Sequence, residues 1–227
     1  MNQKKKALLS IVLAVLLVSS GISAYLIWSA ENKLSSNPIR VACVGDSITQ
    51  STAYPYDLWK LLGGNYTVKN SGVGGTTVSL NSETPYMNTS TFQNALKFQP
   101  DIVIIMLGTN DAQPNLENNN VTFAGDYMKL VQTFQALAGK PKIWIALPPP
   151  LFNNQSGKID PEYLSSTIIP NIETVANNTG VPLINVYAVL NNPNYFRDGE
   201  HPNDEGAQLI ADTVYKAIIS QETLKVV

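Results

Sequence analysis

The chain contains one histidine, His201, and an aspartate, Asp198, lies three positions before it. A serine, Ser47, follows the apolar run at residues 39–44. A serine hydroxyl becomes nucleophilic when a neighbouring base removes its proton, and that base is usually oriented by a carboxylate. Ser47, His201 and Asp198 are therefore candidates for nucleophile, general base and orienting acid. A turn at Gly199 would bring the Asp198 carboxylate to the imidazole Nδ1.

Two further segments supply donors that could stabilise negative charge on an oxyanion. Gly75, in the glycine-rich run at residues 70–76, offers a backbone N–H with no side chain in the way. Asn110, in a Gly-Thr-Asn-Asp run, offers its side-chain amide, and the N–H of Ser47 is a third candidate. Donors aimed at a developing oxyanion lower the barrier to acyl transfer.

Each segment also has an interpretation without chemistry. Residues 45–47 fit a turn with a capping aspartate or serine, and residues 72–75 fit a flexible loop or a phosphate cradle. Residues 110–111 fit a turn, and residues 198–204 fit the start of the last helix. The occurrence of all four segments, in order and each after a predicted strand, favours the catalytic interpretation.

The elements that would position these residues follow from short apolar runs rich in β-branched side chains. Such runs predict five strands buried on both faces, as in a parallel sheet, at residues 39–44, 66–68, 102–107, 143–147 and 183–186. Helical patterns lie between them, at residues 55–62, 91–98, 123–138, 161–177 and 204–219. Pro170 should kink or split the fourth helix.

This alternation predicts the α/β class, with a three-layer α/β/α domain built on a doubly wound, parallel, five-stranded sheet. Ligands bind such sheets at the carboxyl ends of the strands, which is where the candidate residues occur. We therefore expect Ser47, Gly75, Asn110, Asp198 and His201 to meet at one rim.

Composition limits the partners and cofactors. Lys and Arg total 15 against 17 Asp and Glu in 227 residues, so no basic surface for nucleic acid is expected. The single cysteine, Cys43, excludes an internal disulfide, and its apolar strand predicts a buried, inert thiol. The sequence has no Cys/His cluster for zinc, and we expect neither a metal nor an organic cofactor.

The N-terminus has the pattern of a membrane segment. Residues 7–28 are largely apolar and follow three lysines at residues 4–6. We expect residues 1–28 to be a signal-anchor or a cleaved signal peptide, residues 29–37 a linker, and residues 38–227 one domain. The domain should then lie outside the cytoplasm, tethered to the membrane or, if the segment is cleaved, secreted.

Taken together, the segments resemble those of the SGNH hydrolases, also called the GDSL esterase and lipase family. The resemblance implies that Ser47 is the nucleophile, that Gly75 and Asn110 form the oxyanion hole, and that Asp198 and His201 are the acid and base. It covers the whole predicted domain and implies an SGNH, flavodoxin-like fold.

The glycine segment fits the family pattern least closely, so Gly74 is an alternative to Gly75. The Gly-Thr-Asn-Asp run and the Leu-Pro-Pro-Pro run at residues 147–150 are most similar to carbohydrate acetylesterases and lysophospholipase-like esterases. We therefore expect a serine esterase for short, in particular acetyl, esters of an acetylated carbohydrate or a lysolipid. Two alternatives stay open: an O-acyltransferase that uses the same triad on a sugar or lipid, and a catalytically silent surface binding module.

Overall fold

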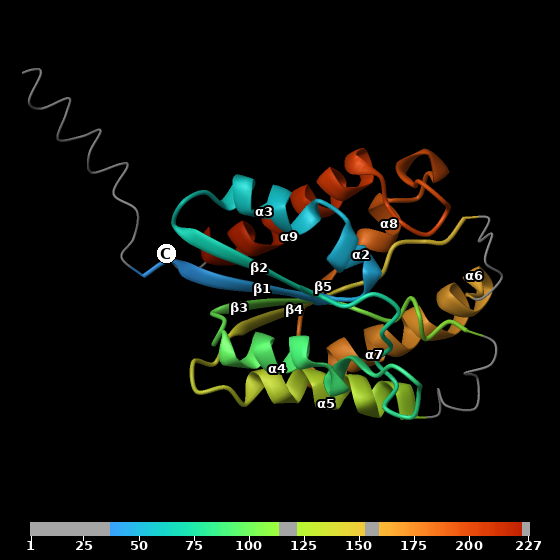
Figure 1. Cartoon of the computed structure of the whole chain (residues 1–227), viewed down its shortest axis with the longest axis horizontal. Helices are drawn as coiled ribbons and strands as arrows, with labels where there is room; N and C mark the ends of the chain where they lie inside the picture. The colour runs from blue at the N-terminus through green and yellow to red at the C-terminus, as the bar shows by residue number, and fades with distance from the viewer. Residues whose placement is uncertain (1–36, 114–121, 153–158, 224–227) are drawn as a thin grey trace, which may run out of the picture. The chain divides into compact units, whose positions relative to one another are not determined.

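Five strands form one parallel sheet in the spatial order β2-β1-β3-β4-β5 (Figure 1). They are β1 (Ile39–Gly45), β2 (Tyr66–Gly72), β3 (Ile102–Met106), β4 (Lys142–Ala146) and β5 (Leu183–Ile184). The computed structural model describes residues 37–113, 122–152 and 159–223. This strand order is that of the flavodoxin-like doubly wound sheet, so the predicted fold class is confirmed.

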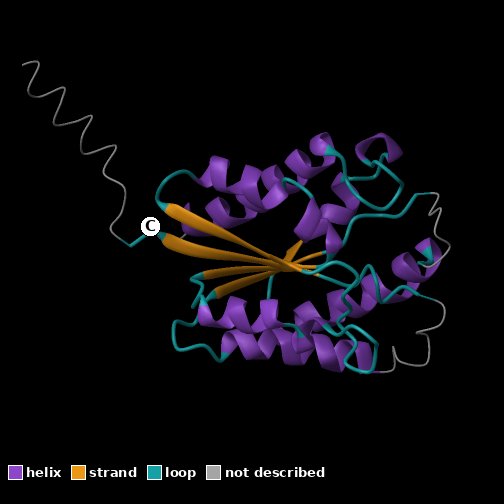
Figure 2. Cartoon of the chain, viewed as in Figure 1, coloured by secondary structure: helices purple, strands orange, loops and turns teal. Residues whose placement is uncertain are grey.

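Helices cover both faces of the sheet (Figure 2). On one face α3 (Tyr54–Leu62) packs against α9 (Asp204–Thr223). On the other face α5 (Phe123–Gln135) packs against α7 (Ile169–Thr179), beside α4 (Ser90–Lys97). The shorter helices and 3-10 turns of the described ranges are α2 (Ser47–Ser51), α6 (Pro161–Tyr163), α8 (Val186–Val189), η1 (Tyr86–Asn88) and η5 (Pro193–Tyr195).

Alternate side chains of β1 enter two separate hydrophobic cores. Ala42 and Val44 pack in the core that includes side chains of α4, α5 and α7. Val41 and Cys43 pack in the core that includes side chains of α3 and α9. All four are fully buried, which is why the strand reads as a continuous apolar run. Burial also raises the pKa of the Cys43 thiol to about 12, so a buried thiol is confirmed and a thiolate is not formed at neutral pH.

The predicted fourth helix is divided, as expected from Pro170. The chain passes from α6 into a π-helical turn, η4 (Leu164–Ile168), and then into α7, where Pro170 is the second residue. Proline lacks the N–H that would continue the hydrogen-bond ladder, and the wider π turn accommodates the interruption. Gly180 ends α7 in the left-handed conformation, with φ of 69°.

Two strands differ in length from the predictions by two residues or more. β2 continues to Gly72, beyond the predicted residues 66–68, through the polar residues Lys69 and Asn70. It pairs only with β1 at the edge of the sheet, so it needs no continuous apolar run. β5 is shorter than predicted because the Asn185 side chain accepts a hydrogen bond from the Ala188 N–H and starts α8.

The predicted membrane segment at residues 1–28 and most of the predicted linker lie outside the described residues. Within the ranges that the structure describes, no helix is both long and apolar enough to cross a membrane.

Candidate active site

The structure brings the predicted nucleophile, base and acid together beyond the carboxyl ends of the strands. Ser47 Oγ lies 3.0 Å from His201 Nε2, and His201 Nδ1 lies 2.8 Å from Asp198 Oδ2. Both distances are those of hydrogen bonds. The three side chains therefore form a continuous line from a hydroxyl to a carboxylate, which is the geometry that nucleophilic catalysis by serine requires.

Ser47 is presented by a tight passage from β1 into α2. A Cβ atom at Gly45 would lie 2.8 Å from the carbonyl oxygen of Met106, and one at Gly72 would lie 2.8 Å from the carbonyl oxygen of Asp46. Only glycine allows such a close approach of backbone to backbone. The two glycines therefore let α2 begin at Ser47 against the ends of three neighbouring strands.

The Asp198 carboxylate organises the loop that carries His201. Its Oδ1 accepts hydrogen bonds from the N–H of Glu200 at 3.0 Å and of His201 at 2.7 Å, while Gly199 turns the chain with φ of 84°. Partial burial acts to raise the pKa of Asp198, but the hydrogen bonds from His201 and Glu200 outweigh it and lower this pKa to about 2. The carboxylate is therefore ionised across the range in which an imidazole can act as a base.

In the glycine loop, the Gly74 N–H is hydrogen-bonded within the chain and the Gly75 N–H is available to a ligand. Gly74 lies against the nucleophile, since a Cβ atom on it would be 3.6 Å from Ser47 Cβ, but its N–H donates to Gln50 Oε1 at 2.8 Å. Gly75, with φ of 73°, has no acceptor for its N–H within the described residues. Of the two glycines, Gly75 is thus the better candidate for an oxyanion donor. As the first residue of α2, Ser47 also has an N–H without an intrahelical acceptor.

Asn110 is buried at the same rim and tied to the glycine loop. Its Nδ2 donates to the carbonyl oxygen of Thr76, next to Gly75, at 3.0 Å. One amide proton is used in this bond, which leaves the second for a ligand. The neighbouring Asp111 accepts from the N–H groups of Val78 and Ser79, each at 2.9 Å, and holds the continuation of the loop.

Two acidic residues lie in the site beyond the predicted site residues, and of these Asp46 was expected only as a possible cap. Asp46 is fully buried, and its Oδ1 caps α2 by accepting from the Ile48 N–H at 2.9 Å. Desolvation raises the pKa of Asp46 to about 7. The Thr109 hydroxyl faces this carboxyl group, although neither Asp46 Oδ2 nor Thr109 Oγ1 makes a hydrogen bond of normal geometry within the described residues. If Asp46 is protonated, its carboxyl O–H can donate a hydrogen bond to Thr109 Oγ1.

The second is Glu200, whose Oε1 lies 3.9 Å from His201 Nε2. Desolvation raises the pKa of this half-buried carboxyl group, while the charge of His201 acts to lower it. Nothing in the sequence except adjacency to His201 marks this residue. Its position beside the atom that would take the serine proton makes it a source of negative charge for an imidazolium.

Among the described residues, no group of three or more His, Cys, Asp or Glu side chains is arranged to hold a metal ion.

A serine, a histidine and an aspartate joined at the carboxyl ends of a flavodoxin-like sheet define a class of protein, the serine hydrolases of the SGNH type. The model of the GDSL-like lipase/acylhydrolase family matches residues 43–209. The chain belongs to this family, which is a family of ester hydrolases, and the family predicted from the sequence is confirmed.

Comparison with individual proteins gives acetylesterases among the relatives. The chain is 34% identical, over 207 residues, to an acetylxylan esterase of Xylanibacter ruminicola. The match covers 79% of this chain and 43% of that protein, so the chain spans less than half of the length of this relative.

Solved structures show the same fold. One is a carbohydrate acetylesterase family member from Sinorhizobium meliloti, with a TM-score of 0.64 and 20% identity over 79% of this chain and 97% of that chain. Another is the native aryl esterase of M. smegmatis, with a TM-score of 0.65 and 20% identity over 80% of this chain and 99% of that chain.

The buried Asp46 predicts a pH-dependent stability. Because its folded pKa, about 7, lies above the ordinary value of 3.8, the folded state holds a proton that the unfolded state releases between these values. The free energy of unfolding should therefore fall as pH rises through this window. Asp46→Asn removes the titrating group and with it this pH dependence. The free energy of unfolding of the variant minus that of wild type, measured in urea, should therefore increase from about pH 4 to about pH 7.

Asp101 provides a control of opposite sign. Its hydrogen bonds with Arg40 lower its pKa, so Asp101→Asn should cost most at neutral pH and less as the pH falls through that pKa. A stability difference for Asp46→Asn that is the same at every pH would contradict a raised pKa for Asp46.

Replacement of Asn110 should produce a kinetic defect. An amide that donates to the developing oxyanion stabilises the transition state more than the ground state, so Asn110→Ala should lower kcat by about 10²–10³ with a much smaller change in KM. Asn185→Ala is the control, because that side chain caps α8 and should affect the melting temperature alone. If Asn110→Ala lowers the melting temperature but keeps kcat within about threefold of wild type, Asn110 is a turn residue and not an oxyanion donor.

Proposed function

We propose that this chain is a serine esterase that removes acetyl groups from carbohydrate through an acyl-enzyme at Ser47. The observation that supports it most is the line of hydrogen-bond distances from Ser47 Oγ through His201 to Asp198, at 3.0 and 2.8 Å. Membership of an ester hydrolase family agrees with this chemistry.

In the acylation step, Ser47 Oγ attacks the ester carbonyl carbon and His201 Nε2 takes the hydroxyl proton. The carbonyl π electrons move to the oxygen, and this oxyanion accepts hydrogen bonds from the Gly75 N–H, the Asn110 amide and the Ser47 N–H. The tetrahedral intermediate collapses, the bond to the alcohol oxygen breaks, and His201 returns the proton to that oxygen. The alcohol leaves and an ester of Ser47 remains.

In the deacylation step, water replaces the serine hydroxyl as nucleophile. His201 Nε2 takes a proton from the water, the oxygen attacks the acyl carbon, and the proton then passes to Ser47 Oγ as the acid is released. Asp198 keeps Nδ1 protonated, so that Nε2 is the basic nitrogen in both steps. Its low pKa means that it stays a carboxylate and stabilises the imidazolium without taking the proton.

Two observations support a small acyl group on a sugar. Polar side chains occur on the segments that carry the site: Gln50 accepts from the Gly74 N–H, Asn110 donates to Thr76 and Glu200 lies beside His201. Such groups offer a long alkyl chain little apolar surface to bury. The similarity to an acetylxylan esterase and to a carbohydrate acetylesterase agrees with an acetylated carbohydrate. Activity on acetyl and butyryl esters should therefore exceed activity on palmitoyl esters.

An acyltransferase would use the same acyl-enzyme and differ only in the nucleophile that deacylates it. Product analysis with free sugars as acceptors separates the two, since a hydrolase releases acetate and a transferase gives an acetylated sugar.

We also propose that the domain acts outside the cytoplasm, anchored or released by its N-terminal segment. The support is the sequence pattern of residues 1–28, and a polymeric carbohydrate is a substrate that would be met there. Fractionation of cells that express the full chain, followed by N-terminal sequencing, tests both parts.

Replacement of the nucleophile is the direct test of the mechanism. Ser47→Ala should lower the hydrolysis of p-nitrophenyl acetate by several orders of magnitude and leave folding intact, as removal of a triad residue does in other serine hydrolases. Ser51→Ala is a matched control on the same helix, because the exposed Ser51 hydroxyl only donates to the Ser47 carbonyl oxygen, at 2.6 Å. Near-normal turnover by Ser47→Ala would refute the proposed mechanism.

A further inference from the structure

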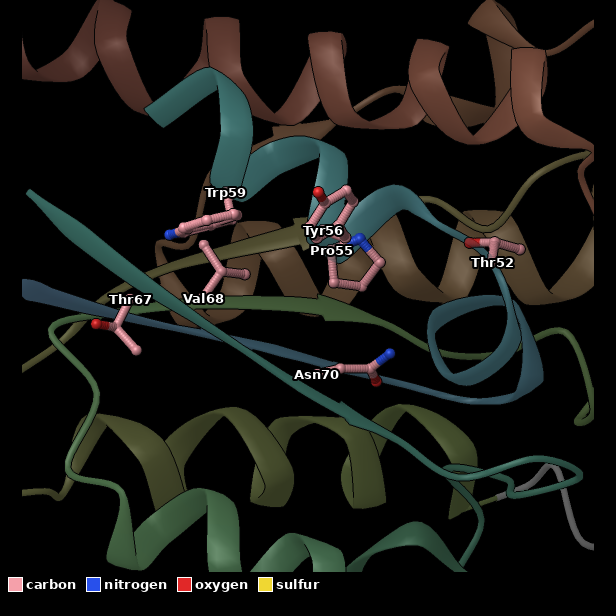
Figure 3. Close-up of a pocket in the computed structure, with 7 residues that line it drawn as sticks. All are labelled: Thr52, Pro55, Tyr56, Trp59, Thr67, Val68 and Asn70. Atoms are coloured by element: carbon pink, nitrogen blue, oxygen red, sulfur yellow. The ribbon is translucent and has the colours of Figure 1, made fainter. Parts of the chain in front are cut away.

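A groove of about 390 Å³ lies between helix α3 and the edge strand β2 (Figure 3). This volume is within the range of small-molecule sites. The groove contains none of the residues assigned above to the reaction. Its lining consists of Thr52, Pro55, Tyr56, Trp59, Thr67, Val68 and Asn70.

Two aromatic side chains of α3 are exposed at this groove. Tyr56 is 59% exposed and Trp59 is 41% exposed, with their ring centroids 5.7 Å apart. In Figure 3 the Trp59 ring lies above Val68 of β2. The core face of the same helix is already filled by Tyr54 and Leu58, which are fully buried. Neighbouring exposed rings that the core does not need are typical of a binding surface.

No acidic or basic side chain lines the groove, and Pro55 and Val68 add apolar surface beside the two rings. The Thr52 hydroxyl donates to the carbonyl oxygen of Ile48, and the Asn70 amide donates to the carbonyl oxygens of Thr49 and Gln50. The hydroxyl of the exposed Tyr56 is therefore the polar group that the lining offers to a ligand. The ammonium of Lys60, which lies over the Tyr56 ring, is paired with Asp57 at 2.8 Å. This lining suits a neutral ligand better than a phosphate or an acidic peptide.

A pyranose ring has the matching chemistry. Its C–H bonds form an apolar face that packs on the negative face of an aromatic ring, and its hydroxyls point outward to hydrogen-bond partners. We propose that this groove is a carbohydrate-binding subsite that holds a neutral sugar residue of the polysaccharide against Trp59. The choice of ligand rests on the proposed acetylesterase function.

The groove is continuous with the structure that supports the active site. Asn70, at its end, donates to the carbonyl oxygen of Thr49 in α2 at 2.8 Å and accepts from the Gly72 N–H at 3.0 Å. The next residue of α2, Gln50, accepts from the Gly74 N–H beside Ser47. A sugar chain held in the groove would therefore extend toward the rim that carries the nucleophile, and would raise the local concentration of its esters there.

Binding is measured without chemistry in the Ser47→Ala background. Calorimetric titration with unacetylated xylohexaose should show binding, and Trp59→Ala should weaken it about tenfold, as expected for loss of one stacking ring. Leu183→Ala is the control, because Leu183 is an exposed apolar residue, 37% exposed, on β5 at the opposite edge of the sheet. It should leave binding unchanged. Equal affinity with and without Trp59 would overturn the proposal.

A second variant keeps Trp59 and closes the groove. Val68→Lys places a long charged side chain beneath the Trp59 ring, from a partly exposed position of β2, and should weaken xylohexaose binding as Trp59→Ala does. Binding should also change the tryptophan fluorescence, and Trp59→Phe should remove this change, since of the other two tryptophans Trp144 is buried and Trp28 belongs to the N-terminal segment. Binding of an extended peptide to the β2 edge, in place of xylohexaose, would overturn a carbohydrate subsite.

Kinetics on two substrates distinguish the carbohydrate subsite from the proposed acetylesterase function. Trp59→Ala should keep the kcat and KM of p-nitrophenyl acetate and should raise the KM for acetylated xylan several-fold. A loss of activity on both substrates would contradict a subsite separate from the reaction. If wild type hydrolyses p-nitrophenyl acetate but not acetylated xylan, the proposed acetylesterase function fails. The binding of xylohexaose still decides the subsite in that case.

Discussion

The contact between Ser47 Oγ and His201 Nε2 joins residues that are 154 positions apart, and the other parts of the site are arranged around it. It forms because the sheet is parallel: Ser47 follows β1, and His201 lies beyond β5 on the approach to α9. The loops after β2 and β3 reach the same rim and bring Gly75 and Asn110. A Cβ atom at Gly45 would meet Thr49 of α2 and the Met106 carbonyl oxygen, so this glycine allows α2 to pack directly on the strand ends.

Structural and chemical roles coincide in this rim. The interpretation of residues 45–47 as a capped turn is correct, because Asp46 caps α2, and the same turn presents Ser47. The last helix likewise begins with a cap. Asn203, two residues after His201, accepts a hydrogen bond from the Gly206 N–H at its Oδ1, at 3.0 Å. These two caps fix the backbone next to Ser47 and His201, so the interpretation of both segments without chemistry describes how the reacting side chains are held in place.

The five strands and the rim could be predicted because buried parallel strands leave continuous apolar runs, and the functional side chains follow those runs directly. Features that depend on three-dimensional packing could not be predicted from the sequence. The polar half of β2 is a strand only because β1 pairs with it, and the pKa of Asp46 depends on burial that no local pattern reveals. Gly74 and Gly75 are equivalent in sequence, and only the hydrogen bond to Gln50 distinguishes them.

The tautomer of His201 is the direct test of whether this residue is the base that activates Ser47. The chain has one histidine, so ¹⁵N-labelled histidine gives a single pair of ring nitrogen signals. At about pH 8 we expect a protonated Nδ1, with a proton shifted downfield by Asp198, and an unprotonated Nε2 facing Ser47. Asp198→Ala should remove the downfield proton. A spectrum with Nε2 protonated and Nδ1 bare would contradict His201 as the base that activates Ser47.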